Sequence, residues 1–339
     1  MQKTDLHELR KDPLLGRWVA VLNQSKSPSE YVFPTEENTE KDCLFCAGRE
    51  RELPPEIMSV PNPGEHSHKW WTRVVPNLSP VFRVEGELGR KGEGMYDKMN
   101  SIGANEIIVE SPYHSVKPED IGLDQMARVL MTYKDRISDL EKDPRLRYTL
   151  IYKNSGISAG SMYSHPLSYL ASTPVIPKRV KEELDGAKQY FAYKERCIFC
   201  DLIREELRFG SRVIIETRGF VAFCPYASKF PFESWIIPKR HNCAFQDVTT
   251  DEIEDMALIL SSVLKKLRHI FDSVPFNYFI HSAPNRIPRK NHWHTLGEDF
   301  HWHLEIMPRL LRTSGFEWGS GLYIVPTSPE NAAKYLREA

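Results

Sequence analysis

The chain has 339 residues, of which 41% are hydrophobic and 27% charged, and its formal net charge is -1. This length suits two domains of ordinary size, and the composition is typical of a globular protein. No stretch approaches the roughly 18 apolar residues that a membrane span needs, so no membrane association is expected. A net charge near zero provides no overall electrostatic field that attracts nucleic acid, so nucleic acid is not an expected partner. A phosphate-bearing ligand would need a local pocket.

The first half is expected to contain strands and one long helix. Gly16 marks a turn before a β-branched and aromatic run, which predicts a strand within residues 13–34. Further strands are predicted at residues 105–110 and 148–153. Between them, apolar residues recur every three or four positions over residues 118–141, which indicates an amphipathic helix.

The second half is expected to repeat this order. Strands are predicted at residues 212–216, 220–223, 233–238 and 277–281, and an apolar stripe predicts a helix over residues 250–271. We therefore expect an α+β fold of two halves related by duplication, each an antiparallel sheet with flanking helices.

The expected division of the chain follows from this duplication. It places the first half at residues 1–190 and the second at residues 191–339, joined by a charged stretch around residues 178–196.

A repeated cysteine motif is the sharpest chemical signal. Each half has a Cys-x-x-Cys motif with phenylalanine in the third place, followed by two histidines in the same order, and zinc prefers four such ligands in a tetrahedron. The predicted ligands are Cys43, Cys46, His114 and His165 in the first half, and Cys197, Cys200, His241 and His301 in the second. A lone motif of this kind could be a pair of buried thiols or a redox pair, but two copies with matching histidines favour one or two zinc sites.

The residues near the start of the chain bear on the compartment. Residues 1–7 lack the apolar core of a secretory signal, so the six cysteines are expected in a reducing compartment, the cytoplasm, where thiols more often bind metal than pair.

These motifs, with others, resemble those of the galactose-1-phosphate uridylyltransferase family of the histidine-triad superfamily. The likeness covers nearly the whole chain and is carried by Arg10–Trp18, Arg73–Asn77, Lys153–Gly156, Phe230–Trp235, His301–Leu310 and Gly315–Gly321. It implies histidine-triad-like halves, a homodimer, a role in galactose or other carbohydrate metabolism, and transfer of a nucleoside monophosphate between a nucleotide sugar and a hexose 1-phosphate. In that family a histidine carries the nucleotidyl group covalently, which splits one difficult transfer into two easier ones.

The resemblance also implies site residues. For nucleotide or sugar it implies Asn77, Asn154, Gly156, Gly160 and Glu317, and for a second metal site it implies Glu183, His281, His301 and His303. This second site competes for His301 with the cysteine site, which we favour because thiolates bind zinc more tightly than carboxylates do.

The sequence departs from the family where the nucleophile should be. Leu167 stands at the nucleophilic histidine, Tyr169 at the glutamine that contacts the phosphate, and Met162 near the expected serine. A leucine cannot accept a nucleotidyl group. By the internal repeat, His303 takes the equivalent place in the second half, followed by Glu305 in the glutamine position.

Three functional hypotheses remain. The chain is a nucleotidyltransferase or nucleotide-sugar phosphorylase, with His303 as the hypothetical nucleophile and Glu317 as a sugar contact. Alternatively it is a catalytically silent paralogue that binds a nucleotide or nucleotide sugar, or a zinc-stabilised scaffold. A nucleic-acid-binding zinc protein is the least favoured, because no basic, aromatic-interleaved stripe is present.

Overall fold

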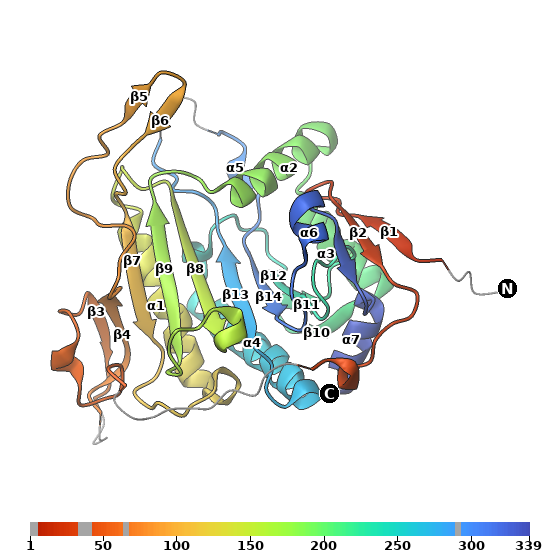
Figure 1. The fold of residues 1–339 in the computed structure, drawn as a ribbon, viewed down its shortest axis with the longest axis horizontal. Coiled ribbons are helices and arrows are strands. Elements are labelled where there is room, and N and C mark those ends of the chain that lie inside the picture. The colour runs from red at the N-terminus through yellow and green to blue at the C-terminus, as the bar shows by residue number, and fades with distance from the viewer. Residues whose placement is uncertain (1–5, 33–42, 64–67, 289–292) are drawn as a thin grey trace.

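A ten-stranded antiparallel sheet forms the centre of the computed structural model, which describes residues 6–32, 43–63, 68–288 and 293–339 (Figure 1). Across the sheet the strands are β10 (Val213–Glu216), β11 (Phe220–Phe223), β12 (Ser234–Pro238), β14 (His303–Pro308), β13 (Phe276–His281), β8 (Tyr148–Ser155), β9 (Leu167–Thr173), β7 (Ala104–Val109), β4 (Trp70–Pro76) and β3 (Met58–Pro61).

The order of these strands reveals the duplication. The order β3-β4-β7-β9-β8 in the first half is mirrored by β10-β11-β12-β14-β13 in the second. The halves join where β8 pairs with β13, in register from Ser155 opposite Phe276 to Ile151 opposite Ile280. The expected α+β fold with antiparallel strands is confirmed, with both sheets merged into one.

Two long helices cover one face of the sheet, behind the strands in Figure 1. They are α1 (Leu123–Leu140) and α4 (Thr250–Phe271), close to the predicted positions, and a capping box of Thr249 and Glu252 starts α4. Their apolar stripes pack with alternate strand residues such as Ile280 and Leu304 into the largest core cluster. Strand residues of the opposite parity therefore face the other side.

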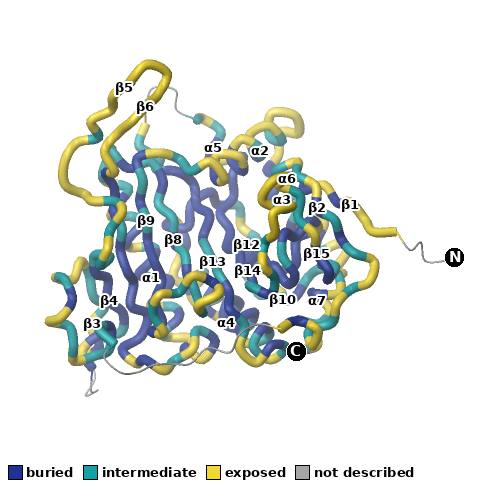
Figure 2. The backbone as a smooth tube through the Cα atoms, in the orientation of Figure 1, coloured by how far each residue is buried: buried dark blue, intermediate teal, exposed yellow. Residues whose placement is uncertain are grey.

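That other side is covered over the second half by α2 (Lys178–Lys194) and α3 (Ile198–Phe209). Leu184 and Ala187 of α2 pack with Phe223 and Trp235, so the charged stretch expected as a linker is a helix with one buried side. Figure 2 shows dark, buried strands in the middle of the molecule and exposed outer loops.

The remaining elements surround the main sheet. A small sheet consists of β1 (Glu8–Lys11), β2 (Trp18–Val21) and β15 (Tyr323–Val325), so the N-terminal strands lie beside the end of the second half. The other elements are the projecting hairpin β5 (Lys91–Glu93) and β6 (Tyr96–Lys98), helices α5 (Leu296–Asp299), α6 (Gly315–Ser320) and α7 (Pro329–Glu338), and the 3-10 turns η1 (Pro28–Glu30), η2 (Glu50–Glu52), η3 (Pro118–Asp120), η4 (Ile157–Ala159) and η5 (Phe245–Asp247). Within the described ranges, no helix is both long and apolar enough to cross a membrane.

Candidate metal centres and ligand cavity

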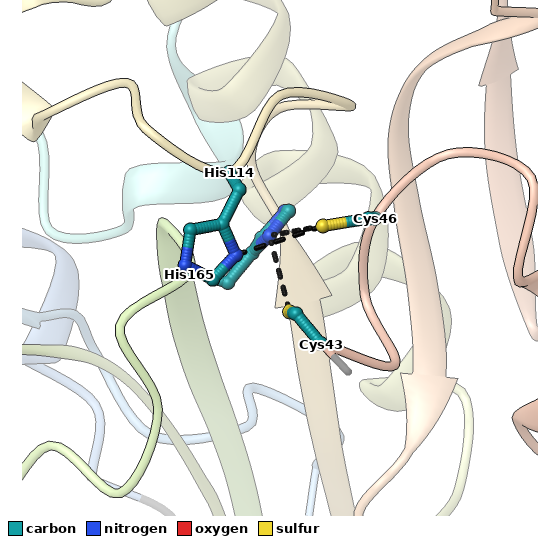
Figure 3. A group of neighbouring side chains, drawn as sticks. All are labelled: Cys43, Cys46, His114 and His165. Atoms are coloured by element: carbon teal, nitrogen blue, oxygen red, sulfur yellow. Dashed lines mark hydrogen bonds between the residues drawn. The ribbon is translucent and has the colours of Figure 1, made fainter. Parts of the chain in front are cut away.

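The first cysteine-histidine group comes together from three separate segments (Figure 3). Cys43 and Cys46 lie in the loop before η2, His114 follows β7, and His165 lies two residues before β9. Sγ of Cys43 lies 3.6 Å from Nδ1 of His165, and Sγ of Cys46 lies 3.6 Å from Nδ1 of His114. Zinc bonds of about 2.3 Å to sulfur and 2.0 Å to nitrogen at tetrahedral angles give sulfur–nitrogen separations of about 3.6 Å. The four side chains therefore fit a tetrahedral zinc ion.

Hydrogen bonds orient the histidines of this group. Nε2 of His165 donates to the carbonyl of Ser111 at 2.8 Å, and Nε2 of His114 lies 3.0 Å from Oγ of Ser164. In both rings Nδ1 faces the cysteines. In His165 the Nε2 proton is donated to a carbonyl, which leaves the Nδ1 lone pair for a metal, as in metal-binding histidines generally. Burial also lowers the pKa of His165 to about 4, which keeps the ring neutral and able to bind metal at neutral pH.

The second cysteine-histidine group has the same construction. Sγ of Cys200 lies 3.3 Å from Nδ1 of His241 and 3.6 Å from Nδ1 of His301, and ligand atoms of these residues and Cys197 lie within 4.8 Å of one another. Nε2 of His241 donates to the carbonyl of Gly297 at 2.9 Å. Hydrogen bonds with Cys197 and the two imidazoles lower the pKa of Cys200, so its thiolate is available as a ligand.

A third group of possible ligands lies between the second half of the sheet and α2. It contains Glu183, His281, His303 and Glu305, all buried, with ligand atoms within 4.8 Å of one another. His301 belongs to the cysteine group and Glu305 takes the fourth place here, so the two sets that competed for His301 are separate. His303 and Glu305 can share this group because alternate residues of β14 face the same side.

Charge interactions hold this third group. Burial lowers the pKa of His281, but the adjacent Glu183 carboxylate outweighs it and raises the pKa overall. Burial raises the pKa of Glu305, but Lys229, whose Nζ lies 3.5 Å away, helps to lower it overall. The group can hold a cation or remain a compensated ionic cluster.

Leu167 is the first residue of β9 and is only 3% exposed. It lies in an apolar cluster with Phe45, Val109 and Tyr169. The ring of Tyr169 stacks on that of Tyr152 with centroids 5.3 Å apart, and burial raises the pKa of Tyr169 to about 12. The two positions that the resemblance assigns to the nucleophile and the glutamine are therefore occupied by tightly packed side chains.

His303 begins β14 as Leu167 begins β9, which agrees with the internal repeat. Its ring is 0% exposed, and its centroid lies 5.1 Å from that of Trp235 and 5.0 Å from that of Phe199. Nε2 of His303 has no hydrogen-bond partner among the described residues, and Oε1 of Glu305 lies 3.7 Å away. The hypothetical nucleophile is thus enclosed in the protein interior.

A cavity of about 420 Å³ lies where β8, β9 and β13 meet the end of α4, which we call the seam cavity. This volume is within the roughly 300–1,000 Å³ of small-molecule sites. Of the residues implied for substrate, Asn154 and Gly156 line it, and Gly160 accepts a hydrogen bond from Asn154 Nδ2 at 3.3 Å. Asn77 and Glu317 are not among its lining residues.

The first metal group forms part of the cavity wall. His114, His165 and Ser164 line the cavity, and the side chain of Met162, 81% exposed, lies beside them. A ligand in the cavity would therefore contact the residues that surround the first metal group.

A buried ion pair beneath the cavity is a feature that the sequence analysis missed. Lys153 donates to Glu110 at 2.5 Å and to the carbonyl of Leu167 at 3.0 Å. Glu110 also accepts hydrogen bonds from the hydroxyls of Tyr133 and Ser168. This network ties β8 and β9 to α1 directly below the nucleophile position. A lysine directly after the mostly apolar run 148–152 was the available signal.

Comparisons with known proteins agree with this architecture. A family model described as galactose-1-phosphate uridyl transferase, C-terminal domain, matches residues 183–321. ADP-glucose phosphorylase of Arabidopsis thaliana is 34% identical, covering 98% of this chain and 92% of that protein, and galactose-1-phosphate uridylyltransferase of Thermotoga maritima is 27% identical, covering 98% of each. The crystal structure of an ADP-glucose phosphorylase from Arabidopsis thaliana with bound ADP-glucose superposes with a TM-score of 0.83 at 34% identity, covering 98% of this chain and 99% of that one. These relatives are enzymes of nucleotidyl or phosphate transfer, and the chain belongs to the galactose-1-phosphate uridylyltransferase family.

Proposed function

We propose that this chain binds a nucleotide sugar without forming a covalent nucleotidyl-histidine intermediate on β9. The observation that supports the proposal is the packing of Leu167, which is 3% exposed and lies in an apolar cluster. The resemblance to the family assigns the nucleophile to this position. The histidines that line the seam cavity are His114 and His165. Both direct Nδ1 at the cysteines and have Nε2 hydrogen-bonded, so neither offers a free nitrogen for attack on phosphorus.

The kind of ligand follows from the family and from the cavity. One relative has been crystallised with bound ADP-glucose, and another is named as a uridylyltransferase of galactose 1-phosphate. The seam cavity combines polar groups of Asn154, Ser155 and Ser164 with apolar walls from Leu267 and Phe276. Such a mixture suits a ligand that carries both hydroxyl groups and ring faces. A sugar phosphate is the expected second ligand.

We further propose that the two cysteine-histidine groups each bind a zinc ion. Four protein ligands leave zinc no open position, so the expected role is structural. In the first half the ion would join the loops that carry His114 and His165, and thereby hold one wall of the seam cavity. The third group, with Glu183 and His281, is the alternative second metal site.

Nucleotidyl transfer through His303 is the second candidate function. It is favoured by the unpartnered Nε2 of His303 and by the neighbouring Glu305 carboxylate. Because the ring is fully buried between Trp235 and Phe199, this route would require α3 to move away from the sheet. A cytoplasmic location, a role in galactose or carbohydrate metabolism and a homodimer stay predictions.

Calorimetric titration with ADP-glucose and UDP-glucose tests the binding proposal. Ser155 lines the seam cavity, and Ser158, three residues further on, does not. We expect Ser155→Trp to fill the cavity and weaken binding at least about tenfold, whereas Ser158→Trp, the matched control, leaves affinity unchanged. Failure of the wild type to bind either nucleotide sugar would contradict the proposal.

A further inference from the structure

The turn that follows α4 has a rare backbone conformation. Asp272 has φ 60° and ψ -57°, and the amide of Ser273 donates to the carbonyl of Phe271 at 2.7 Å. This is a γ-turn of the positive-φ kind, which is strained for any residue with a Cβ atom. Among the described residues, the other non-glycine residues with positive φ are Glu195 and Phe232. Asp272 alone of the three lines the seam cavity.

Asp272 is exposed, and its carboxylate interacts electrostatically with Arg268. Within the described part of the chain it accepts no hydrogen bond and forms no salt bridge. Arg268 also contacts Asp120 and Glu119 across the seam between the halves. A glycine would adopt this turn without strain. The structure therefore keeps an acidic residue, rather than a glycine, in a strained turn that lines the cavity.

The surroundings of this carboxylate suit a sugar ring. Leu267 and Phe276 supply apolar wall, and Ser155 and Asn154 lie on the same cavity as Asp272. A carboxylate has two acceptor oxygens and no donor, so it matches a pair of adjacent hydroxyl groups.

The geometry points to the seam cavity as the site of the sugar portion of a nucleotide sugar, with the Asp272 carboxylate accepting hydrogen bonds from two adjacent sugar hydroxyls. The inference rests on the proposed function, because it takes a nucleotide sugar as the ligand. It adds that Asp272, which belongs to the second half, decides the affinity for the sugar rather than for the nucleotide. Both halves then build one ligand site.

Calorimetry with two pairs of probes tests this assignment: ADP-glucose with ADP, and UDP-glucose with UDP. For the pair that binds, we expect Asp272→Asn to weaken binding of the nucleotide sugar about tenfold or more and to leave the nucleoside diphosphate unchanged, because hydrogen bonds to a charged acceptor are the strong ones. Asp97→Asn, in the exposed hairpin β5–β6, is the control and should change neither affinity.

A second variant separates strain from binding. Asp272→Gly should lose the same affinity for the nucleotide sugar while the melting temperature rises by about 2 °C, since glycine relieves the strained turn. If Asp272→Asn binds the nucleotide sugar as tightly as the wild type does, this inference is overturned and the proposed function stands. If the wild type binds no nucleotide sugar, the proposed function falls and this inference falls with it.

Discussion

The buried ion pair of Lys153 and Glu110 offers a quantitative test of the structure. The side chains are 2% and 1% exposed, so removal of one charge leaves the other without solvent. Loss of one partner of such a pair costs about 3–5 kcal/mol. Because Tyr133 and Ser168 still donate hydrogen bonds to Glu110, we expect Lys153→Met to lower the free energy of unfolding by about 3 kcal/mol, near the lower end. Urea denaturation monitored by circular dichroism measures this change.

Two further variants control this experiment. Lys178→Met removes an exposed pair with Glu182, 91% and 54% exposed at 3.7 Å, and should cost less than about 0.5 kcal/mol. The double variant Lys153→Met with Glu110→Gln should recover most of the loss, because the neutral amide no longer buries an unpaired charge. A loss below about 1 kcal/mol for Lys153→Met alone would refute the assignment of this pair as a buried, mutually dependent one.

Two other predictions concern metal and pH. Cys200→Ser should bind one zinc ion per chain instead of two, as measured by inductively coupled plasma mass spectrometry. The control is Cys224→Ser, which changes a cysteine outside both groups and should keep both ions. Equal zinc content in the two variants would contradict the second site. Burial raises the pKa of Glu330, but its backbone hydrogen bond and the guanidinium groups of Arg10 and Arg212 outweigh burial and lower it below 4.5. The charged Glu330 therefore stabilises the fold above about pH 4.5, and this stabilisation is lost as the pH falls through the lowered pKa of the folded state. The difference in melting temperature between wild type and Glu330→Gln should shrink below about pH 4.5. A difference that does not change with pH would be inconsistent with this linkage.

Local patterns predicted the long helices and several strands well. The apolar stripes of α1 and α4 and the β-branched runs of β7 and β8 are signals carried within single segments. The stretch that forms α2 was expected as a linker because its charges conceal one apolar side formed by Val180, Leu184 and Ala187. Its burial depends on a core cluster shared with residues of β11 and β12, which no local pattern reveals.

The metal-ligand sets show the same limit. Repetition of the Cys-x-x-Cys motif was enough to predict which residues gather in each cysteine group. The sequence alone could not assign His301 to one of the two ligand sets, because the assignment depends on where β14 begins. His301 precedes the strand, whereas His303 and Glu305 lie on one side of it. The proposed role of Asp272 could likewise not be predicted from the sequence, because it depends on a backbone turn and on a cavity shared by the two halves.

Covalent labelling decides whether the chain binds a nucleotide sugar without forming a nucleotidyl-histidine adduct. The zinc-loaded protein is incubated with ADP-glucose or UDP-glucose labelled in the α-phosphate, quenched in alkali and searched for acid-labile label on the chain, with His303→Asn in parallel. We predict that the wild type binds the labelled nucleotide sugar and retains no covalent label. Acid-labile label on the wild type that disappears in His303→Asn would contradict the claim and assign nucleotidyl transfer to the second half.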